Sequence, residues 1–407
     1  MRILFVVDLA YPDHAGGSHR FCYEVARRLV QRGHEVHLIT GKVSDDPATP
    51  DDERIDGVSY HRLSRDKRNF VSHALSYILG ARRTFDQLAR QAPFDVISAH
   101  YVLPTLGVLL SPWKHLTPVV FTFHGPWTGE FGVELQREGR DLPTLARLRR
   151  AAWIIPTLAL TRGLERLTLA RSARLHTLSQ YTAEIAVRDY GVPRSKIVVV
   201  PGGVDTARFA PAADRIAVRQ RLDLPSDRPL LLTVRRLYAR MGLENLVQAM
   251  RTVIRRQPRA LLLVVGKGPL RGRLQALVEQ FGLAENVRLL GYVEDGRLPL
   301  YYQAADFFIL PTLYLEGFGL VTLEALACGT PVLGTPVGGT VEILSGLDPR
   351  LLFASSRPED MAKGMLEHLS AAAISRERCR RYVLEHYSWD KTTIELEAIF
   401  RLVTETV

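Results

Sequence analysis

The stretch from residue 307 to 333 reads FFILPTLYLEGFGLVTLEALACGTPVL, and it decides the fold. Residues 307–310 form an apolar run that ends at Pro311, which predicts a buried parallel strand. From Leu320 onward the apolar residues recur every three or four positions, which predicts a helix closed by Gly329. A further strand follows. This order of strand, glycine-containing turn, helix and strand is typical of an open α/β sheet, in which the N–H groups at a helix start face the ligand crevice.

Two glutamates flank this turn. Glu316 precedes it, and Glu324 lies inside the apolar stripe of the predicted helix. Helix N–H groups bind phosphate, whereas carboxylates accept hydrogen bonds from hydroxyl groups. The pair therefore fits a ligand with phosphates in its middle and polyols at both ends, such as a nucleotide sugar. The alternative is that Glu316 caps the helix and Glu324 pairs with a neighbouring cation, which is the commoner situation for an isolated pair at this spacing.

The whole run resembles the donor site of the retaining glycosyltransferases of family 4, with its E-x7-E pair, its EGFG and EALACGTPV elements and a downstream GG-x-x-E. The resemblance implies that Glu316 contacts hydroxyl groups of the donor sugar and that Glu324 holds the ribose. It also implies that the diphosphate is bound by the backbone N–H groups of Phe318, Gly319 and Leu320. Within this run there is one departure from the family, because the stretch before Glu316 is one residue longer than the commonest form.

The chain has 407 residues, enough for two domains with full cores. Cys22, Cys328 and Cys379 are odd in number and form no C-x-x-C pattern, so we expect packing roles and a reducing compartment. The apolar run at 3–7 is broken by Asp8 and has no cleavage site, which predicts a first strand and not a secretory signal. No stretch is apolar enough to span a bilayer. We therefore expect a cytoplasmic protein.

The net charge of +10 and the pI near 9.6 imply attraction to anions, which include nucleic acid, acidic lipids and phosphorylated substrates. Many arginines lie between Arg137 and Arg174. This segment is a peripheral face for an anionic membrane at the inner side, a site for an anionic or lipid-linked acceptor, or a pair of amphipathic helices with a solvated arginine face. The arginines are not interleaved with stacking aromatic residues, so we expect no nucleic-acid partner.

Paired glycines, Gly16 and Gly17, follow the first predicted strand and precede a helix. Such a backbone can approach a phosphate or a sugar closely, although a plain turn has the same appearance. The family resemblance implies that the pair faces the donor. His19, at the start of the helix, could meet the acceptor or the donor phosphate.

Two further strands are predicted at 95–98 and 119–123, and each is followed by a histidine, His100 and His124. Both side chains are expected at the carboxyl end of the sheet, where ligands bind. For His100 the sequence leaves open a packing role and a contact with the acceptor. The TFHGPW run resembles the histidine of the family's donor-sugar pocket, which implies that His124 donates a hydrogen bond to the transferred sugar.

The run PGGVD at 201–205, with the later Phe209, resembles the junction between the two domains of the family. We therefore expect an acceptor domain at residues 1–207, a linker at 208–228 and a nucleotide-sugar domain at 229–388. A terminal helix at 389–407 is expected to pack back on the first domain.

Arg235 and Arg236 end the first predicted strand of the second domain, and one of them must face the crevice because side chains alternate along a strand. There it could bind phosphate through two parallel hydrogen bonds, the alternative being a surface ion pair. The family commonly has an arginine followed five positions later by a lysine. Arg236 matches, but position 241 is Met241. Either Arg240, Arg235 or Lys267 replaces the missing cation, or the donor is handled differently.

The turn of Gly266 and Gly268 is not a dinucleotide fingerprint, because the position of the third glycine is Arg271, so NAD is disfavoured. The resemblance implies instead that this turn contacts the donor and that the nucleotide base lies near Tyr292 and Val293.

These observations predict an α/β protein of the GT-B architecture, with two Rossmann-like domains facing across a cleft. The expected reaction moves a sugar from a nucleoside-diphosphate sugar to a hydroxyl of a glycan, lipid-linked or small-molecule acceptor, with retention of anomeric configuration. The resemblance assigns catalytic roles to His124, Arg236 and Glu316. The donor is a co-substrate, and we expect neither a tightly bound cofactor nor a metal. The alternative is an epimerase or a sugar-nucleotide-binding protein without glycosyl transfer.

Overall fold

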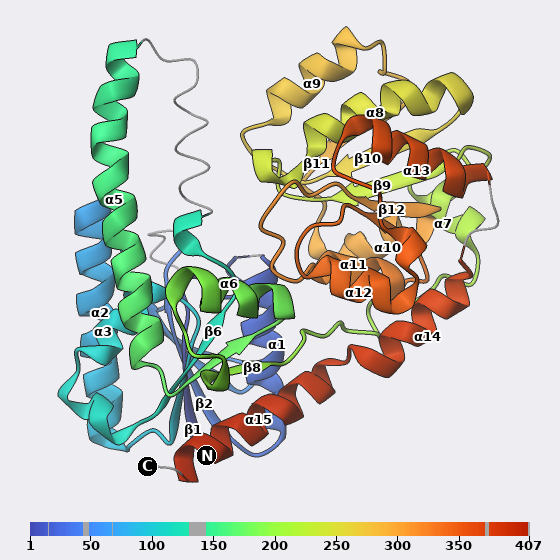
Figure 1. The fold of residues 1–407 in the computed structure, drawn as a ribbon. Helices are drawn as coiled ribbons and strands as arrows, with labels where there is room; N and C mark the ends of the chain where they lie inside the picture. The colour runs from blue at the N-terminus through green and yellow to red at the C-terminus, as the bar shows by residue number, and fades with distance from the viewer. Residues whose placement is uncertain (15, 44–48, 67, 130–143, 371–373, 406–407) are drawn as a thin grey trace. The chain divides into compact units, whose positions relative to one another are not determined.

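The computed structural model describes residues 1–14, 16–43, 49–66, 68–129, 144–370 and 374–405. The chain forms two compact units (Figure 1). Unit 1 comprises Met1–Gly202 and Trp389–Val407, and unit 2 comprises Gly203–Ser388. Each unit has its own sheet, and the strand at the centre of each sheet is apolar.

Unit 1 contains a sheet of eight strands in the order β3-β4-β2-β1-β5-β6-β7-β8, in which only the β3–β4 pair is antiparallel. The strands are β1 (Arg2–Val6), β2 (Glu35–Gly41), β3 (Asp52–Ile55), β4 (Val58–Leu63), β5 (Val96–Ala99), β6 (Val119–Phe123), β7 (Arg174–Thr177) and β8 (Ile197–Val199). The helices are α1 (Gly17–Gln31), α2 (Phe70–Gln91), α3 (Val102–Leu109), α5 (Thr144–Arg171), α6 (Gln180–Tyr190) and α15 (Trp389–Glu405), with short 3₁₀ turns at Pro112–Leu116 and Arg194–Lys196.

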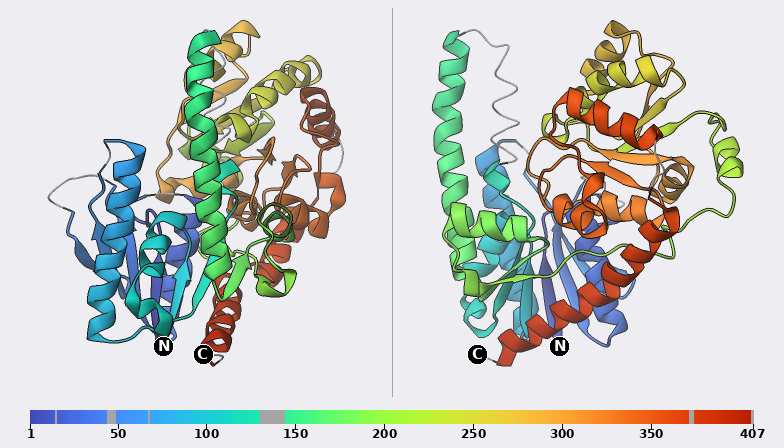
Figure 2. Two further views of the ribbon diagram at one scale, coloured as in Figure 1. Left: turned by 60° about the vertical axis from the view of Figure 1, so that its left-hand side comes forward. Right: turned by 45° about the vertical axis from the view of Figure 1, so that its right-hand side comes forward.

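The middle of this sheet is apolar on both faces. Strands β5 and β6 are buried along their whole length, and β1 along almost all of it. Such strands need cover on both sides. Helices α2, α3 and α5 lie on one side of the sheet, and α1 and α15 lie side by side on the other (Figures 1 and 2).

Ion pairs tie α15 to α1. Arg28 Nε donates to Asp390 Oδ1 at 2.9 Å, and Arg32 pairs with Glu397. Burial alone would raise the pKa of Glu397, but hydrogen bonds from Arg401 and Arg32 lower it to about 2. The carboxylate is therefore charged at neutral pH and holds the end of the chain on unit 1.

Unit 2 contains a fully parallel sheet of five strands in the order β11-β10-β9-β12-β13. The strands are β9 (Leu230–Val234), β10 (Leu261–Val265), β11 (Val287–Gly291), β12 (Phe307–Leu310) and β13 (Val332–Gly334). The helices are α7 (Arg215–Arg221), α8 (Leu243–Arg256), α9 (Arg271–Gln280), α10 (Leu298–Ala304), α11 (Leu320–Ala327), α12 (Thr340–Leu347), α13 (Pro358–Ser370) and α14 (Arg376–His386), with 3₁₀ turns at Ala239–Met241, Asp295–Arg297 and Pro349–Leu351.

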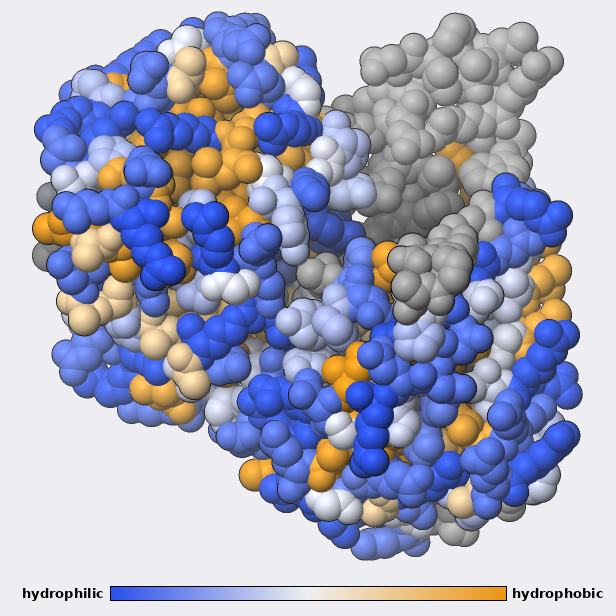
Figure 3. Space-filling view, turned by 180° about the vertical axis from the view of Figure 1, so that it is seen from behind, coloured by the Kyte–Doolittle hydropathy of each residue, from blue (hydrophilic) through white to orange (hydrophobic). Residues whose placement is uncertain are grey.

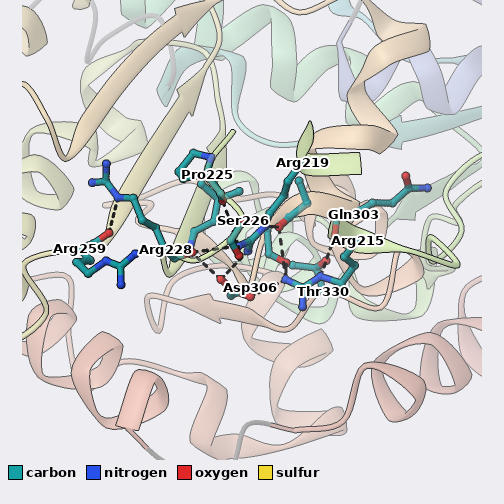
Figure 4. A network of polar contacts seen from close by, with 12 residues as sticks. Arg215, Arg219, Pro225, Ser226, Arg228, Arg259, Gln303, Asp306 and Thr330 are labelled. Carbon is teal, nitrogen blue, oxygen red and sulfur yellow. Dashed lines mark hydrogen bonds and ion pairs between the residues drawn. The ribbon is translucent and has the colours of Figure 1, made fainter. Parts of the chain in front are cut away.

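The segment 208–228, which composition suggested was a linker, belongs to unit 2 (Figure 4). It contains α7, whose Arg215 and Arg219 lie one helical turn apart and bind the two oxygens of Asp306 at 2.5 and 2.8 Å. The Leu230 N–H donates a third bond to Asp306, at 2.8 Å. The polar composition did not reveal that this segment packs on unit 2, because its arginines pack through hydrogen bonds and not through an apolar stripe.

Helix α5 lies in the arginine-rich segment, whose residues 130–143 fall outside the described part of the chain. It runs as one helix through Pro156, where the sequence suggested two. Arg162 and Arg166 each donate to the main-chain oxygen of Asp189, at 2.9 and 3.1 Å. Among the described residues, none of the helices has both the length and the apolar composition of a membrane span.

Candidate functional site

The buried carboxylate of Glu316 lies in the loop that follows β12, at the carboxyl end of the unit 2 sheet. Its side chain and that of Arg235 are 10% and 7% exposed, and Arg235 Nη2 lies 2.5 Å from Glu316 Oε2. Thr312 Oγ1 donates to the same oxygen at 3.0 Å. Two charges are thus withdrawn from water and paired in the place where α/β sheets bind ligands.

Arg235 has donor capacity that the protein does not use. Its Nη2 also contacts Met241 Sδ at 2.8 Å and Thr312 Oγ1 at 3.1 Å. Its Nε is buried and has no hydrogen-bond partner in the described part of the chain. A buried donor without a partner costs about 1–3 kcal/mol, which a ligand oxygen would offset. Arg235 is therefore a candidate ligand contact.

The start of α11 offers further donors. The N–H groups of Phe318, Gly319 and Leu320 donate to no other group among the described residues. Gly319 has a φ of +93°, and a Cβ on it would lie 2.2 Å from Thr340 Oγ1. A Cβ on Gly338 would likewise lie 2.1 Å from the main-chain oxygen of Glu316. Glycine at both positions lets α12 and the Glu316 loop approach closely.

Glu324 is held in place by a buried tyrosine. Tyr302 Oη donates to Glu324 Oε2 at 2.8 Å. Burial, and then the charge of Glu324, raises the pKa of Tyr302 well above its usual value, so the hydroxyl keeps its proton. One oxygen of Glu324 is therefore fixed before any ligand arrives, which favours a precise contact.

The loop that carries Glu316 is strained and clamped. Leu315 has a φ of +58°, in the left-handed region that costs a non-glycine residue about 1–2 kcal/mol. Arg240 holds the loop on both sides, since its main-chain oxygen accepts from the Leu313 N–H and its Nη1 donates to Leu315 O, each at 2.8 Å. This clamp lies in the stretch before Glu316 that is one residue longer than the commonest form of the family.

The remaining predicted donor contacts lie on neighbouring strand ends. Arg236 is exposed and stacks over the ring of Tyr238, 5.2 Å from its centroid. The turn of Gly266 and Gly268 is bonded to the backbone after β9, where the Leu237 N–H donates to Lys267 O at 2.8 Å. Two other predicted contacts follow β11, where Tyr292 is exposed and Val293 is half-buried.

In unit 1, His100 and His124 meet at the ends of β5 and β6. His100 Nδ1 lies 3.1 Å from His124 Nε2, and His100 Nε2 lies 3.0 Å from Ser98 Oγ. The two ring centres are 5.4 Å apart and the planes differ by 24°, so the rings meet edge to edge. Burial, strengthened by the neighbouring histidines, lowers the pKa of His100 far below its usual value and that of His124 to about 3. Both rings are neutral at physiological pH.

Both ring nitrogens of His100 have protein partners, and its contact with the acceptor stays a prediction. Cys22 joins the pair, and one ligand atom from each of the three residues lies within 4.8 Å of the others. Spacing alone did not reveal that Cys22 lies beside these two histidines. The ring nitrogens of His100 and His124, however, point at each other, which is the geometry of an N–H···N hydrogen bond. Burial also raises the pKa of the Cys22 thiol well above its usual value.

A second cluster of polar side chains in unit 1, made of His19, Ser18 and Tyr101, lies beside the glycine loop before α1. Gly16 precedes α1, Gly17 is its first residue, and a Cβ on Gly16 would lie 2.6 Å from His19 Nδ1. Tyr101 Oη lies 3.1 Å from His19 Nε2 and 2.6 Å from Ser18 Oγ. Ser18, Ser98 and Tyr101 were not predicted. Their only signal was adjacency, since each lies within two residues of a predicted histidine.

Comparisons with known proteins identify the family. The model described as Glycosyltransferase Family 4 matches residues 15–208, and the model described as Glycosyl transferases group 1 matches residues 214–386. A D-inositol 3-phosphate glycosyltransferase of Xylanimonas cellulosilytica is 31% identical over 345 residues, which covers 80% of this chain and 76% of the relative. The chain belongs to the family 4 glycosyltransferases.

Solved structures show the glycosyltransferase fold. Sucrose-phosphate synthase from Thermosynechococcus elongatus is similar with a TM-score of 0.80 and 23% identity, and the match covers 100% of both chains. Anabaena HepE, in a structure with UDP-glucose, is similar with a TM-score of 0.74 and 16% identity, again over 100% of both chains. The protein is thus a glycosyltransferase of the GT-B fold with Rossmann-like domains.

The glycosyltransferase departs from the expected family pattern where Met241 replaces lysine. Of the three cations considered as replacements, Arg240 clamps the Leu315 loop and Lys267 lies over the Tyr292 ring, 4.6 Å from its centroid. The guanidinium of Arg235 contacts the Met241 side chain, with Nη2 2.8 Å from Sδ. The buried guanidinium of Arg235 therefore occupies the space beside Met241 and brings a cation to Glu316.

Proposed function

We propose that this glycosyltransferase moves a sugar from a nucleoside-diphosphate sugar to an acceptor hydroxyl with retention of anomeric configuration. One observation carries the proposal. Glu316 and Glu324 are both fixed by protein partners, and between them lie the unused N–H groups at the start of α11. Carboxylates on either side of an anion site suit the hydroxyl groups that flank a diphosphate.

In this proposal unit 2 binds the donor. The α11 N–H groups and the guanidinium groups of Arg235 and Arg236 receive the diphosphate, and the base lies near Tyr292 and Val293. Glu316 accepts hydrogen bonds from the sugar, and Glu324 from the ribose. The unpaired Nε of Arg235 supports its contact with the donor. These fixed donors stabilise the negative charge that develops on the leaving diphosphate.

The chemical step follows from this charge placement. The bond between the anomeric carbon and the phosphate oxygen breaks, and its electron pair stays on the diphosphate. The acceptor oxygen bonds to the anomeric carbon on the same face, and its proton passes to the departing phosphate oxygen. In unit 1, His124 donates a hydrogen bond to the transferred sugar. The chain's own groups supply this electrostatic stabilisation, so we expect no metal requirement.

The acceptor belongs to unit 1 in this proposal, and its class is a sugar, a small polyol or a lipid-linked sugar. The relative from Xylanimonas is named for D-inositol 3-phosphate, so inositol phosphates belong in the first acceptor panel. His19 lies on the glycine loop with Tyr101 and is the proposed acceptor contact there.

The test is transfer by the full chain with UDP-, GDP- and ADP-sugars and this acceptor panel, with the product followed by NMR. We expect one donor to be consumed and an α-linked product to form from an α-linked donor. A β-linked product would contradict retention. Binding of a donor without transfer or hydrolysis would favour a sugar-nucleotide-binding protein, and conversion of the donor into another free sugar nucleotide would favour an epimerase.

We also propose that α5 brings unit 1 to an anionic membrane. Ile155, Leu160 and Leu167 on this helix are 66%, 58% and 39% exposed. Orange apolar and blue hydrophilic side chains alternate along the right-hand margin of Figure 3. Co-sedimentation with vesicles tests the proposal. Binding to anionic but not to neutral vesicles, weakened by Ile155→Asp, is expected, and equal sedimentation without vesicles would contradict it.

A further inference from the structure

Ser98, His100 and His124 form a hydrogen-bonded chain whose direction can be worked out by counting hydrogens. The hydroxyl of Ser98 carries one hydrogen, and each neutral imidazole carries one. The chain contains two hydrogen bonds, Ser98 Oγ to His100 Nε2 at 3.0 Å and His100 Nδ1 to His124 Nε2 at 3.1 Å. Either all three hydrogens point from Ser98 towards His124, or all point the other way.

The surroundings of Ser98 decide between the two directions. Ser98 is 2% exposed, and within the described residues His100 is the only hydrogen-bond partner of its side chain. If His100 donated to Ser98, the buried hydroxyl hydrogen would have no acceptor, which costs about 1–3 kcal/mol. If Ser98 donates, its buried hydroxyl hydrogen has a partner, and the one hydrogen left over lies on Nδ1 of His124, which is only half-buried. His100 then carries its hydrogen on Nδ1 and donates it to His124 Nε2.

We propose that Ser98 and His100 hold His124 in the Nδ1–H tautomer, so that His124 presents an N–H donor and not a lone pair to the ligand. His100 is thus a positioning residue for His124. The contact of His124 with the transferred sugar rests on the proposed function, but the tautomer does not. The rings cannot easily turn, because Phe5 lies against His100 at 5.5 Å and Phe21 against His124 at 5.7 Å between ring centres.

A third histidine on the next strand has the opposite arrangement. His176 Nε2 lies 2.9 Å from the main-chain oxygen of Val200, which can only accept, so this nitrogen carries the hydrogen. Its Nδ1 then accepts from Thr122 Oγ1 at 3.1 Å. Burial lowers the pKa of His176 to about 4, so this ring is also neutral. The fold therefore gives the neighbouring rings of His124 and His176 opposite tautomers, because the hydrogen-bond partner of one ring nitrogen decides which nitrogen carries the hydrogen.

The proposal predicts how kinetics respond to loss of the Ser98 hydroxyl. In Ser98→Ala, His100 can reverse, and His124 then faces the sugar with a lone pair for part of the time. We expect kcat to fall about tenfold while KM for the donor stays within about twofold, because the donated hydrogen bond strengthens as charge develops. Thr122→Ala is the matched control, since it removes a buried hydroxyl from His176 and leaves the Ser98 chain intact.

The deciding experiment reads the tautomers directly from two-bond ¹H–¹⁵N correlations of the histidine rings in the full chain at neutral pH. The groups around His124 at that pH are His100, His176, His19 and the Cys22 thiol. The expected spectrum shows Nδ1–H forms for His100 and His124 and an Nε2–H form for His176. Ser98→Ala should shift the first two only, and Thr122→Ala the third only.

An Nε2–H form of His124 in the wild-type spectrum would overturn the proposal, and so would an unchanged His100 signal in Ser98→Ala. Should Ser98→Ala misfold, His100→Asn provides a second variant, in which the fixed tautomer of His124 is expected to be lost. If the tautomers are as expected but no donor is bound by the protein, the proposed function fails and the tautomer assignment stands.

Discussion

Strand β12 has a carboxylate at each end, and arginines hold both. At the amino end, Asp306 receives Arg215, Arg219 and the Leu230 N–H, so both of its oxygens are engaged by the scaffold (Figure 4). At the carboxyl end, Glu316 receives Arg235 and Thr312 through a single oxygen, and Arg235 keeps a buried Nε that no described group satisfies.

The difference separates an ion pair that stabilises the fold from one that we propose binds the donor. Around Asp306 both carboxylate oxygens have protein partners, and Arg219 Nε also donates to Ala304 O at 2.9 Å, so the network joins α7 to the neighbouring end of α10 and to the sheet. Around Glu316, Arg235 Nε and the N–H groups at the start of α11 have no partner among the described residues, and the neighbouring Leu315 is strained. Backbone strain and unsatisfied donors gather at functional sites because the rest of the fold supports their cost.

The largest effect is expected from Glu316→Gln. The change removes the counter-charge of Arg235 and a proposed sugar contact, so the transfer rate should fall by about 10²–10³-fold. A buried arginine without a partner should also lower the free energy of unfolding by about 3 kcal/mol. The double variant Glu316→Gln with Arg235→Gln should recover most of that stability and none of the activity. Transfer activity in the double variant would show that the Glu316–Arg235 pair, like the Asp306 network, serves stability alone.

Asp306→Asn should act on stability alone. Losing one charge from a paired network is expected to cost about 2 kcal/mol of unfolding free energy, measured by urea denaturation, without changing the donor affinity. Burial would raise the pKa of Asp306, but hydrogen bonds from Arg215 and Leu230 and the charge of Arg219 lower it overall.

Since the folded-state pKa of Asp306 is lowered, its contribution is complete above the unfolded value near ~3.9 and is lost as the pH falls through the folded value. The stability difference between the wild type and Asp306→Asn should therefore shrink on acidification below about pH 4. A difference that grew at low pH, or a weakened donor affinity at pH 7, would break the comparison.

Arg236→Ala tests the exposed arginine beside the site. Arg236 has no role in the core, so the free energy of unfolding should change by less than about 0.5 kcal/mol. If Arg236 binds the diphosphate, KM for the donor should rise about tenfold. Unchanged kinetics would leave Arg235 as the only cation of the pair that serves the donor.

The smallest effect is expected at Leu315, where glycine and alanine can be compared. At ordinary helix or strand positions glycine is the less stable of the two, but at a φ of +58° it escapes the steric strain of a Cβ. Leu315→Gly should therefore be more stable to urea than Leu315→Ala by about 1 kcal/mol. The reverse order would mean that the loop is not strained.

The fold and the carboxylate pair were predictable because they depend on local patterns. The apolar run at 307–310, the helix from Leu320 and the glycine turns each have a period or a residue type that physical rules assign. The segment 208–228 was misassigned because Arg215 and Arg219 pack by charge, which hydrophobic periodicity cannot detect.

The sequence could not say which of Arg235 and Arg236 is buried, since alternation predicts opposite faces but not which face is inside. The hydrogen bonds of His100 with His124 and of Ser18 with Tyr101 join residues that are 24 and 83 positions apart in the chain. Such contacts arise from sheet order, and sheet order is set by the packing of the whole unit. The same reason hid the approach of Cys22 to His100.

The most direct test of the account is thermal unfolding with UDP-, GDP- and ADP-sugars, applied to the wild type, Glu324→Gln and Asp306→Asn. A ligand at 100 times its Kd adds about 2.7 kcal/mol to a native state that binds it. The account predicts that one nucleotide sugar raises Tm equally in the wild type and in Asp306→Asn, and leaves Glu324→Gln unchanged. An equal rise in Glu324→Gln, or no rise with any nucleotide sugar, would contradict it.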